Sequence, residues 1–197
     1  MATSFLSKVY PLLHCWWILW SNHRWKDVER HNMVIDDKVD EWILKPLNSI
    51  SDIKAMTCQA YKRFEWTRDG VDQLFDSMCP PPYNYVRYKT GVLKDDCDGY
   101  HALMYQILHA NNIECYLMSV VDWQWGHCIL LFKFENNWYT MDYTTIRKPF
   151  ATAEEAIKDY DDDYAQRCRR KYLDTNGFVE YDYEKGIWKN KPKKELL

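Results

Sequence analysis

One cysteine, one histidine and one aspartate have the types and spacing that a nucleophilic triad requires. Cys97 follows two aspartates and begins a predicted helix, His127 begins a predicted strand, and Asp142 lies late in the next strand, 15 residues further on. Thiolate is the reactive form of cysteine, and a helix N-terminus favours it. An imidazole can take the thiol proton, and a carboxylate can hold that imidazole in the required tautomer. These residues predict covalent acyl transfer, with the Cys97 backbone N–H as one donor to the oxyanion.

Two other interpretations of Cys97 stay open. A free cysteine is among the most buried residue types, so Cys97 could be a packing residue. Cys97 and His101, four residues apart, could also bind zinc together with Cys115 or Cys128. The sequence has no second paired-ligand motif, which weighs against zinc. We expect His101 and His109 to be helix-surface or packing residues.

Hydrophobic periodicity predicts the elements that must position these side chains. Apolar residues recur at helical spacing from about residue 97 to residue 110, and Asn111-Asn112 ends the helix. Strands are predicted at 113–121, 127–134 and 138–143, with a hairpin turn at 135–137. If Asn136-Asn137 were a strict two-residue turn, Leu131 would lie opposite Asp142. His127 would then be roughly 13 Å away along its strand, so we expect a longer loop or a bulge beside the site.

The remaining segments give weaker patterns. A short helix that includes Val39, Trp42 and Ile43 should end at Pro46, and a second helix should run from Ser51 to Phe64. The run Cys79-Pro80-Pro81-Pro82 predicts an extended loop, and 83–93 a loop or irregular strand. A charged helix should start near Thr152 and end near Lys171. Residues 177–188 are typical of a strand or hairpin.

Length and composition limit the domain organisation. A chain of 197 residues predicts one domain, which we place at 36–188, with a Trp-rich arm or helix at 1–35 and a solvated basic tail at 189–197. Trp16, Trp17 and others in the arm should pack on the domain or dock on a protein partner.

Charge and cysteine usage exclude several classes. The net charge of −3 argues against a nucleic-acid partner. The longest apolar run, Cys15 to Trp20, is too short for a membrane span. Seven cysteines without a CxxC pair indicate free thiols in a reducing compartment rather than a disulfide framework, so we expect a cytoplasmic protein whose residues 1–25 are not a signal peptide.

Three blocks in order carry a resemblance that covers about residues 60–150. They are Asp96-Cys97-Asp98-Gly99-Tyr100-His101-Ala102-Leu103, Gly126-His127-Cys128-Ile129-Leu130-Leu131-Phe132 and Asn137-Trp138-Tyr139-Thr140-Met141-Asp142-Tyr143-Thr144. Together they resemble the transglutaminase-like superfamily, as does the upstream stretch Phe64-Glu65-Trp66-Thr67-Arg68-Asp69. Asp95 stands where that family has glycine, and His127-Cys128 replaces the commoner His-Ala. The resemblance implies an α+β fold with a papain/transglutaminase-like core, in which the helix bearing Cys97 packs on an antiparallel sheet bearing His127 and Asp142.

The expected function is therefore cysteine-dependent acyl transfer at an amide or isopeptide bond of a protein or peptide. Water as acceptor would make a protease or amidase, an amine would make a transglutaminase, and neither route requires a metal or cofactor. The resemblance also suggests an upstream side chain as second oxyanion donor, and the candidates are Trp66, Tyr85 and Tyr88. Trp123 and Trp125 flank His127 and should line a substrate groove or cap the core. The alternative function is a structural or interaction protein of a larger assembly that keeps the fold without turnover.

Overall fold

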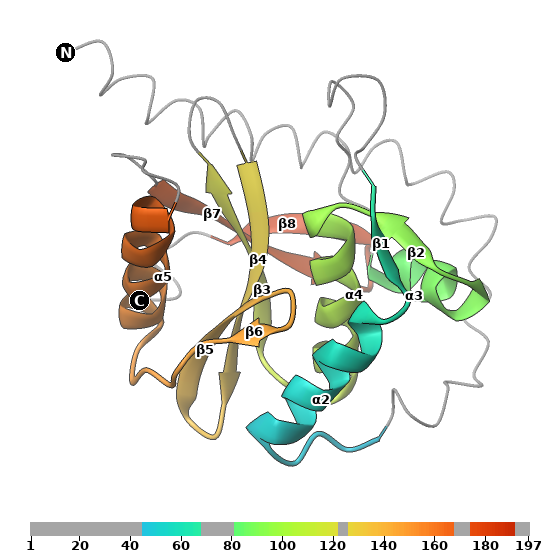
Figure 1. Ribbon diagram of the computed structural model, residues 1–197, viewed down its shortest axis with the longest axis horizontal. Coiled ribbons are helices and arrows are strands. Elements are labelled where there is room, and N and C mark those ends of the chain that lie inside the picture. The colour runs from blue at the N-terminus through green and yellow to red at the C-terminus, as the bar shows by residue number, and fades with distance from the viewer. Residues whose placement is uncertain (1–44, 68–80, 122–125, 168–173, 192–197) are drawn as a thin grey trace, which may run out of the picture.

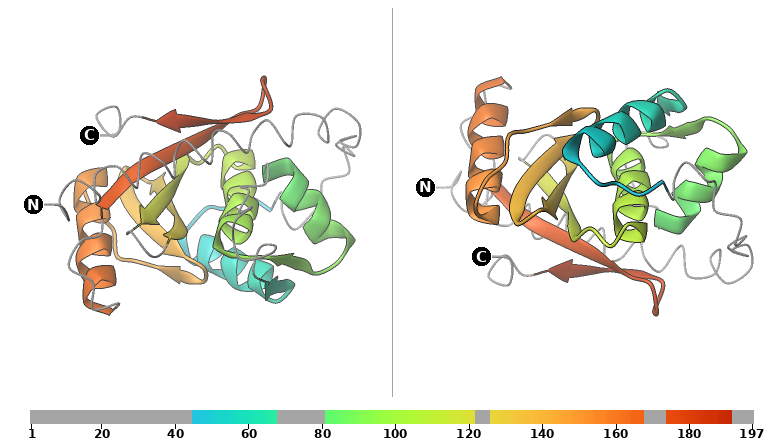
Figure 2. Two further views of the ribbon diagram at one scale, coloured as in Figure 1. Left: turned by 90° about the horizontal axis from the view of Figure 1, so that it is seen from above. Right: turned by 90° about the horizontal axis from the view of Figure 1, so that it is seen from below.

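A six-stranded antiparallel sheet separates two layers of helix (Figure 1). The computed structural model describes residues 45–67, 81–121, 126–167 and 174–191. The strands lie in the order β6-β5-β4-β3-β7-β8. Helix α5 covers one face and α4 the other, and both views of Figure 2 show this separation. The predicted α+β class, with the helix that bears Cys97 packed on the antiparallel sheet that bears His127 and Asp142, is confirmed.

The elements have the following bounds. The helices are α2 (Ile50–Tyr61), α3 (Pro81–Thr90), α4 (Cys97–Ala110) and α5 (Ala153–Arg167). The strands are β1 (Phe64–Trp66), β2 (Leu93–Asp95), β3 (Cys115–Val121), β4 (Gly126–Phe134), β5 (Asn137–Asp142), β6 (Thr145–Ile146), β7 (Asp174–Asp182) and β8 (Ile187–Lys191). β1 and β2 form a separate parallel pair.

Helix α4 begins and ends where its sequence predicts. The Asp96 side chain accepts the Asp98 N–H and so caps the first turn. Asn112 ends the helix with a positive φ of 58°, a conformation that asparagine tolerates. Most side chains of α4 are buried, because the sheet covers one side and α2 and α3 lie on the other. The helix is therefore the centre of the larger core.

The β4–β5 hairpin sets the position of His127 relative to Asp142. Its turn is Glu135-Asn136, one residue earlier than the strict turn considered from the sequence, and both residues have positive φ (47° and 65°), as a type I′ turn requires. Leu130 pairs with Met141, so the same register sets Asp142 opposite Ile129. His127 is then two residues from that position rather than four. The expected longer loop or bulge is not found in the β4–β5 pairing, because the turn itself brings the two side chains to diagonal positions on one face. The register does shift between Ser119 and Val121 of β3, beside His127, but in the pairing of β3 with β7.

The two faces of the sheet bury two separate cores. Alternate residues of β4 face α4 and pack with its apolar side chains; they include Cys128, Leu130 and Phe132. The intervening residues Ile129 and Leu131 face α5. His127 has the same parity as Ile129, so its side chain belongs to the α5 face.

Residues 81–90 overturn a sequence prediction. The segment 83–93 was expected to be a loop or irregular strand, but α3 starts at Pro81 and ends at Thr90. Proline is well tolerated in the first turn of a helix, where its missing N–H leaves no bond unmade, so Pro81 and Pro82 begin this helix instead of preventing it. Only the last part of the segment, from Leu93, is a strand.

Two further boundaries differ from expectation. Helix α2 starts after Ser49, whose hydroxyl accepts the Asp52 N–H, but it ends at Tyr61, and Phe64 begins β1 instead of closing the helix. The predicted short helix ending at Pro46 and the Trp-rich arm lie outside the described residues, apart from Pro46 itself, which is not helical.

At the C-terminal end, strand β8 continues into the segment predicted to be a solvated tail. β8 runs to Lys191, and Lys189 forms an ion pair with Asp182 across the β7–β8 hairpin. Lys191 pairs with Glu180 at 3.4 Å. Alternating basic residues on an edge strand opposite acidic ones therefore act as cross-strand pairs. Among the described helices, none has the length and hydropathy of a membrane span.

Candidate active site

His127 and Asp142 form a hydrogen-bonded pair at one end of the sheet. His127 Nε2 lies 2.8 Å from Asp142 Oδ1, and the imidazole is 9% exposed. Burial alone would raise the pKa of Asp142, but the hydrogen bond and charge of His127 and the bond from the Tyr160 hydroxyl lower it to about 2. Asp142 is thus ionised near neutral pH and accepts the Nε2 proton, which leaves Nδ1 as the ring nitrogen suited to take a proton from a substrate or a thiol.

Cys97 lies at the N-terminus of α4, against the strand that carries His127. The N–H of Cys128, the residue after His127, donates to Cys97 Sγ at 3.4 Å. The Cys97 side chain is half-buried, whereas Cys115 and Cys128 are buried and Cys58 is exposed. Burial raises the pKa of the Cys115 thiol, which makes that thiol unreactive. Of these four cysteines, only Cys97 is partly exposed, lies at a helix N-terminus and contacts β4, the strand that bears His127.

His101 connects the cysteine helix to the turn after Asp142. It is fully buried, and the Tyr143 N–H donates to its Nε2 at 3.0 Å. Nε2 is therefore the acceptor and Nδ1 carries the proton, which it donates to the Cys97 carbonyl at 2.6 Å. Burial lowers the pKa of His101 to about 4, so this imidazole is neutral. Because backbone groups engage both nitrogens, His101 is not disposed to bind zinc as the alternative interpretation requires.

Helix α5 contacts the His–Asp pair on the face of the sheet opposite α4. The Tyr160 hydroxyl donates to Asp142 Oδ2 at 2.9 Å, so the two carboxylate oxygens have different partners. The Tyr164 ring stacks on His127 with 5.8 Å between ring centroids and 19° between planes. The two tyrosines are one helical turn apart and stack on each other.

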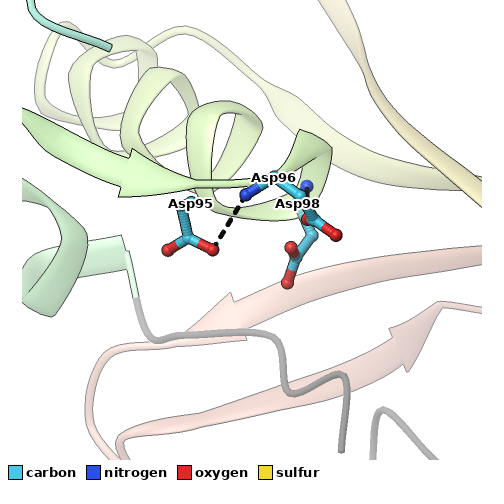
Figure 3. A group of neighbouring side chains, drawn as sticks. All are labelled: Asp95, Asp96 and Asp98. Carbon is cyan, nitrogen blue, oxygen red and sulfur yellow. Dashed lines mark hydrogen bonds between the residues drawn. The ribbon is translucent and has the colours of Figure 1, made fainter. Parts of the chain in front are cut away.

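Three buried aspartates surround the start of α4 (Figure 3). Oxygen atoms of Asp95, Asp96 and Asp98 lie within 4.8 Å of one another. Two of the carboxylates bind backbone groups: Asp95 accepts the Asp96 N–H at 3.1 Å, and Asp96 accepts the Asp98 N–H at 3.2 Å. These bonds are those of a helix start and give the cluster a structural role.

Gly99 fits beneath the Asp95 carboxylate. A Cβ at Gly99 would lie 2.2 Å from Asp95 Cγ, which no side chain could accommodate without movement. The buried Asn84 amide donates to the Gly99 carbonyl at 3.2 Å and so attaches α3 to the first turn of α4. Asp95 and Gly99 thus form one packed unit directly beside Cys97.

The three candidates for a second oxyanion donor lie in different surroundings. Trp66 pairs in register with Asp95, two residues before Cys97, and its side chain is 55% exposed. Tyr85 is half-buried against the α4 core. The Tyr88 hydroxyl donates to the Gln59 carbonyl of α2 at 3.3 Å, so its proton is engaged within the helical layer. The substrate-binding candidates Trp123 and Trp125 lie outside the described residues.

Sequence reasoning assigned no role to three residues of this site: Tyr143, Tyr160 and Tyr164. His101, expected on the helix surface or in packing, is a packing residue whose two nitrogens also bind backbone groups. The four-residue spacings Cys97–His101 and Tyr160–Tyr164 were the available signals, since such pairs lie on one helix face. His109, the other histidine of α4, is exposed and stacks on Tyr183.

Comparison with known proteins finds distant structural neighbours only. No family model matches the sequence, and no curated protein matches it. Among solved structures, the fold is similar to one named "Putative Cysteine Protease from Cytophaga hutchinsonii", with 14% sequence identity and a TM-score of 0.40. The match covers 64% of this chain and 38% of that one, so the chain spans well under half of the neighbour's length.

Proposed function

We propose that this protein is a cysteine-dependent acyl-transfer enzyme of the transglutaminase-like superfamily that acts on an amide or isopeptide bond. The observation that carries the proposal is the 2.8 Å bond between His127 Nε2 and Asp142 Oδ1, with Cys97 Sγ against the N–H of the residue after His127. An acid–base pair and a thiol at a helix N-terminus are the components that covalent acyl transfer needs.

In the proposed reaction, the Cys97 thiol loses its proton to His127 Nδ1 and the sulfur attacks the substrate carbonyl carbon. His127 then gives that proton to the leaving amine as the tetrahedral intermediate collapses to a thioester. Water or a second amine attacks the thioester, His127 takes the proton of that nucleophile, and the thiolate leaves and is reprotonated. Asp142 holds the imidazole in the tautomer with its proton on Nε2.

The oxyanion would accept bonds from the Cys97 backbone N–H and from a second donor. Trp66 is the favoured side chain, because its strand pairs with the residue two positions before Cys97 and its indole is accessible. Removing one such donor lowers turnover ~10²–10³-fold. Trp66→Phe should do so, and Tyr88→Phe, which removes a hydroxyl bound to α2, should leave turnover nearly unchanged.

The test of the proposal is the rate of iodoacetamide labelling at each cysteine between pH 5 and 9, followed by peptide mass spectrometry. Cys97 should be labelled faster than Cys58 at pH 6 to 7, although Cys58 is more exposed. His127→Ala should slow the labelling of Cys97 and leave the labelling of the other cysteines unchanged, because the imidazole accepts the thiol proton and stabilises the thiolate. His101→Gln serves as a matched control that removes a neighbouring imidazole of structural role.

Labelling of Cys97 no faster than that of Cys58 would contradict the proposal. It would favour the alternative of a structural protein that keeps the fold. Where Cys97 is reactive, incorporation of monodansylcadaverine into casein indicates an amine acceptor, and cleavage or ammonia release without incorporation indicates water.

A further inference from the structure

Four side chains form a closed ring of contacts between the sheet and α5. His127 binds Asp142, Asp142 accepts the Tyr160 hydroxyl, Tyr160 stacks on Tyr164 at 5.6 Å, and Tyr164 stacks on His127. Tyr160 is fully buried and Tyr164 is 6% exposed. Each member of the acid–base pair therefore has its own tyrosine partner on α5.

Arg147 packs on Tyr160 and pairs with acidic residues of α5. Its guanidinium lies 4.9 Å from the centre of the Tyr160 ring and forms ion pairs with Asp159 and Asp163, which are four residues apart on one side of α5. Because one planar guanidinium binds two carboxylates of α5, it restricts both the rotation of α5 about its axis and its distance from the sheet. The orientation of the Tyr160 hydroxyl thus follows from the docking of the whole helix.

The chemistry of the two contacts differs. A hydroxyl that donates to Asp142 Oδ2 fixes the plane of the carboxylate and leaves Oδ1 for His127. An aromatic face that covers an imidazole stabilises the protonated ring by a cation–π interaction, worth more in a desolvated site than in water. Both effects act on the state in which His127 holds the proton of Cys97.

We propose that Tyr160 and Tyr164 are positioning residues of the active site, with Tyr160 orienting the Asp142 carboxylate and Tyr164 stabilising the protonated imidazole of His127. The inference rests on the proposed function. It assigns to α5, on the face of the sheet opposite Cys97, control over the ion pair between the thiolate and the imidazole.

Other titratable groups near His127 do not supply this effect. His101 approaches from α4, Asp142 from β5 and Tyr143 from the turn after β5. Cys97, at the start of α4, contacts the N–H of Cys128, the residue after His127. His101 stays neutral over the range tested, because both its nitrogens bind backbone groups. Burial raises the pKa of Tyr143, so it too stays neutral, and the carboxylate of Asp142 stays charged.

The experiment is the pH profile of Cys97 alkylation by iodoacetamide in the full-length protein and its Tyr164 variants. Tyr164→Leu should move the midpoint of the profile upward by about 0.5 to 1 pH unit, a three- to tenfold loss of rate at the foot of the curve. Tyr164→Phe keeps the aromatic face and should leave the midpoint unchanged. In a His127→Ala background, Tyr164→Leu should have no further effect.

Tyr160 is tested by the same measurement. Tyr160→Phe keeps the stack and removes only the hydroxyl, and it should lower the alkylation rate at pH 6.5 two- to fivefold. That loss should disappear in an Asp142→Ala background, because the hydroxyl acts through the carboxylate. Far-UV circular dichroism and the denaturation midpoint establish that each variant is folded.

The outcomes separate this inference from the proposed function. If wild-type Cys97 is no more reactive than Cys58, the proposed function fails and this inference fails with it. If wild-type Cys97 is reactive but folded Tyr164→Leu keeps the wild-type midpoint, or Tyr164→Phe shifts it equally, the positioning role is overturned while the proposed function stands.

Discussion

The two helices that cover the sheet differ in what surrounds them. Helix α4 is enclosed by the sheet on one side and by α2 and α3 on the other, and most of its side chains are buried. Helix α5 touches the sheet with one stripe, of which Ala156, Ile157 and Tyr160 are members, and its other residues are mostly charged. α4 bears Cys97, whereas α5 supplies contacts to His127 and Asp142.

This difference indicates that α4 mainly determines the stability of the fold, whereas α5 mainly affects the protonation of the His127–Asp142 pair. A helix enclosed on all sides fixes the position of the group at its N-terminus, because no movement of α4 is possible without opening the main core. A helix attached by one stripe and by ion pairs can be altered with less damage to the fold. Changes on the α4 side should therefore act mainly through stability, and changes on the α5 side mainly through the acid–base pair.

The largest expected effect comes from the acid–base pair itself. Asp142→Asn keeps the shape of the side chain but removes the charge that favours the Nε2 tautomer of His127, so turnover should fall ~10²–10⁴-fold. The protein should remain folded at pH 7. Steady-state kinetics and a denaturant titration together check this, and a turnover loss below tenfold would assign the proton transfer to other groups.

A test of the two cores compares Leu103→Ala on α4 with Ile157→Ala on α5. Both side chains are almost fully buried, and such truncations cost about 2 to 5 kcal/mol. The loss for the Leu103 variant should lie at the upper end of this range, because the sheet on one side and α2 and α3 on the other enclose the site and cannot collapse into the cavity. Urea denaturation at pH 7 gives both values, and a larger loss for Ile157→Ala would reverse the comparison.

Acid should weaken the α4 side through His101. The pKa of His101 is about 4 in the folded protein and about 6.5 when unfolded, so the unfolded chain binds the extra proton between these values. The free energy of unfolding should therefore fall by up to about 3 kcal/mol as pH drops from 6.5 to 4. Asp142, lowered to about 2, should add a further loss below about pH 4.

His101→Gln offers a donor and an acceptor without a titratable ring. It should flatten the dependence of unfolding free energy on pH between 6.5 and 4, and His109→Gln on the exposed side of the same helix should keep most of it. Denaturant titrations at pH 7, 5.5 and 4.5 measure the slopes. An unchanged slope in His101→Gln would assign the acid sensitivity to other groups.

The smallest effect concerns the start of α4. Gly99→Ala places a methyl group 2.2 Å from Asp95 Cγ, so it should cost about 1 to 3 kcal/mol through overpacking. Gly91→Ala, where no atom lies within 4 Å, should be nearly neutral. Adding Asp95→Gly, the residue type of the family motif at that position, should recover part of the loss. A thermal or urea melt of the wild type and these three variants would disprove the clash if Gly99→Ala matched Gly91→Ala.

Local sequence patterns were sufficient for some parts of the fold. The apolar stripe and the flanking Asp96 and Asn111 predict α4 with its observed ends, and the three motif blocks name Cys97, His127 and Asp142 as candidates. Helix α3 was missed because prolines were interpreted as breakers, although at the first turn they are not. Strand β1 was missed since three residues of strand have little periodicity.

The contacts between layers could not be predicted, because they depend on register. Moving the hairpin turn by one residue changes which residue lies opposite Asp142, and the sequence around 135–137 permits either position. Tyr160 and Tyr164 fall on an apolar stripe that predicts packing, and only the folded sheet places an acid–base pair beneath them. Their roles, like that of Cys97, stay predictions until reactivity is measured.

The Glu135-Asn136 turn has a consequence for how this protein can diverge. Hairpin tips usually accept insertions and deletions, because they lie far from the core. Here one added or deleted residue that shifted β5 against β4 would turn Asp142 toward the opposite face, away from both His127 and Tyr160. If the proposed reaction is correct, homologues that carry it out should vary in sequence at this tip but conserve its length, and length variation there should accompany loss of the His127–Asp142 pair.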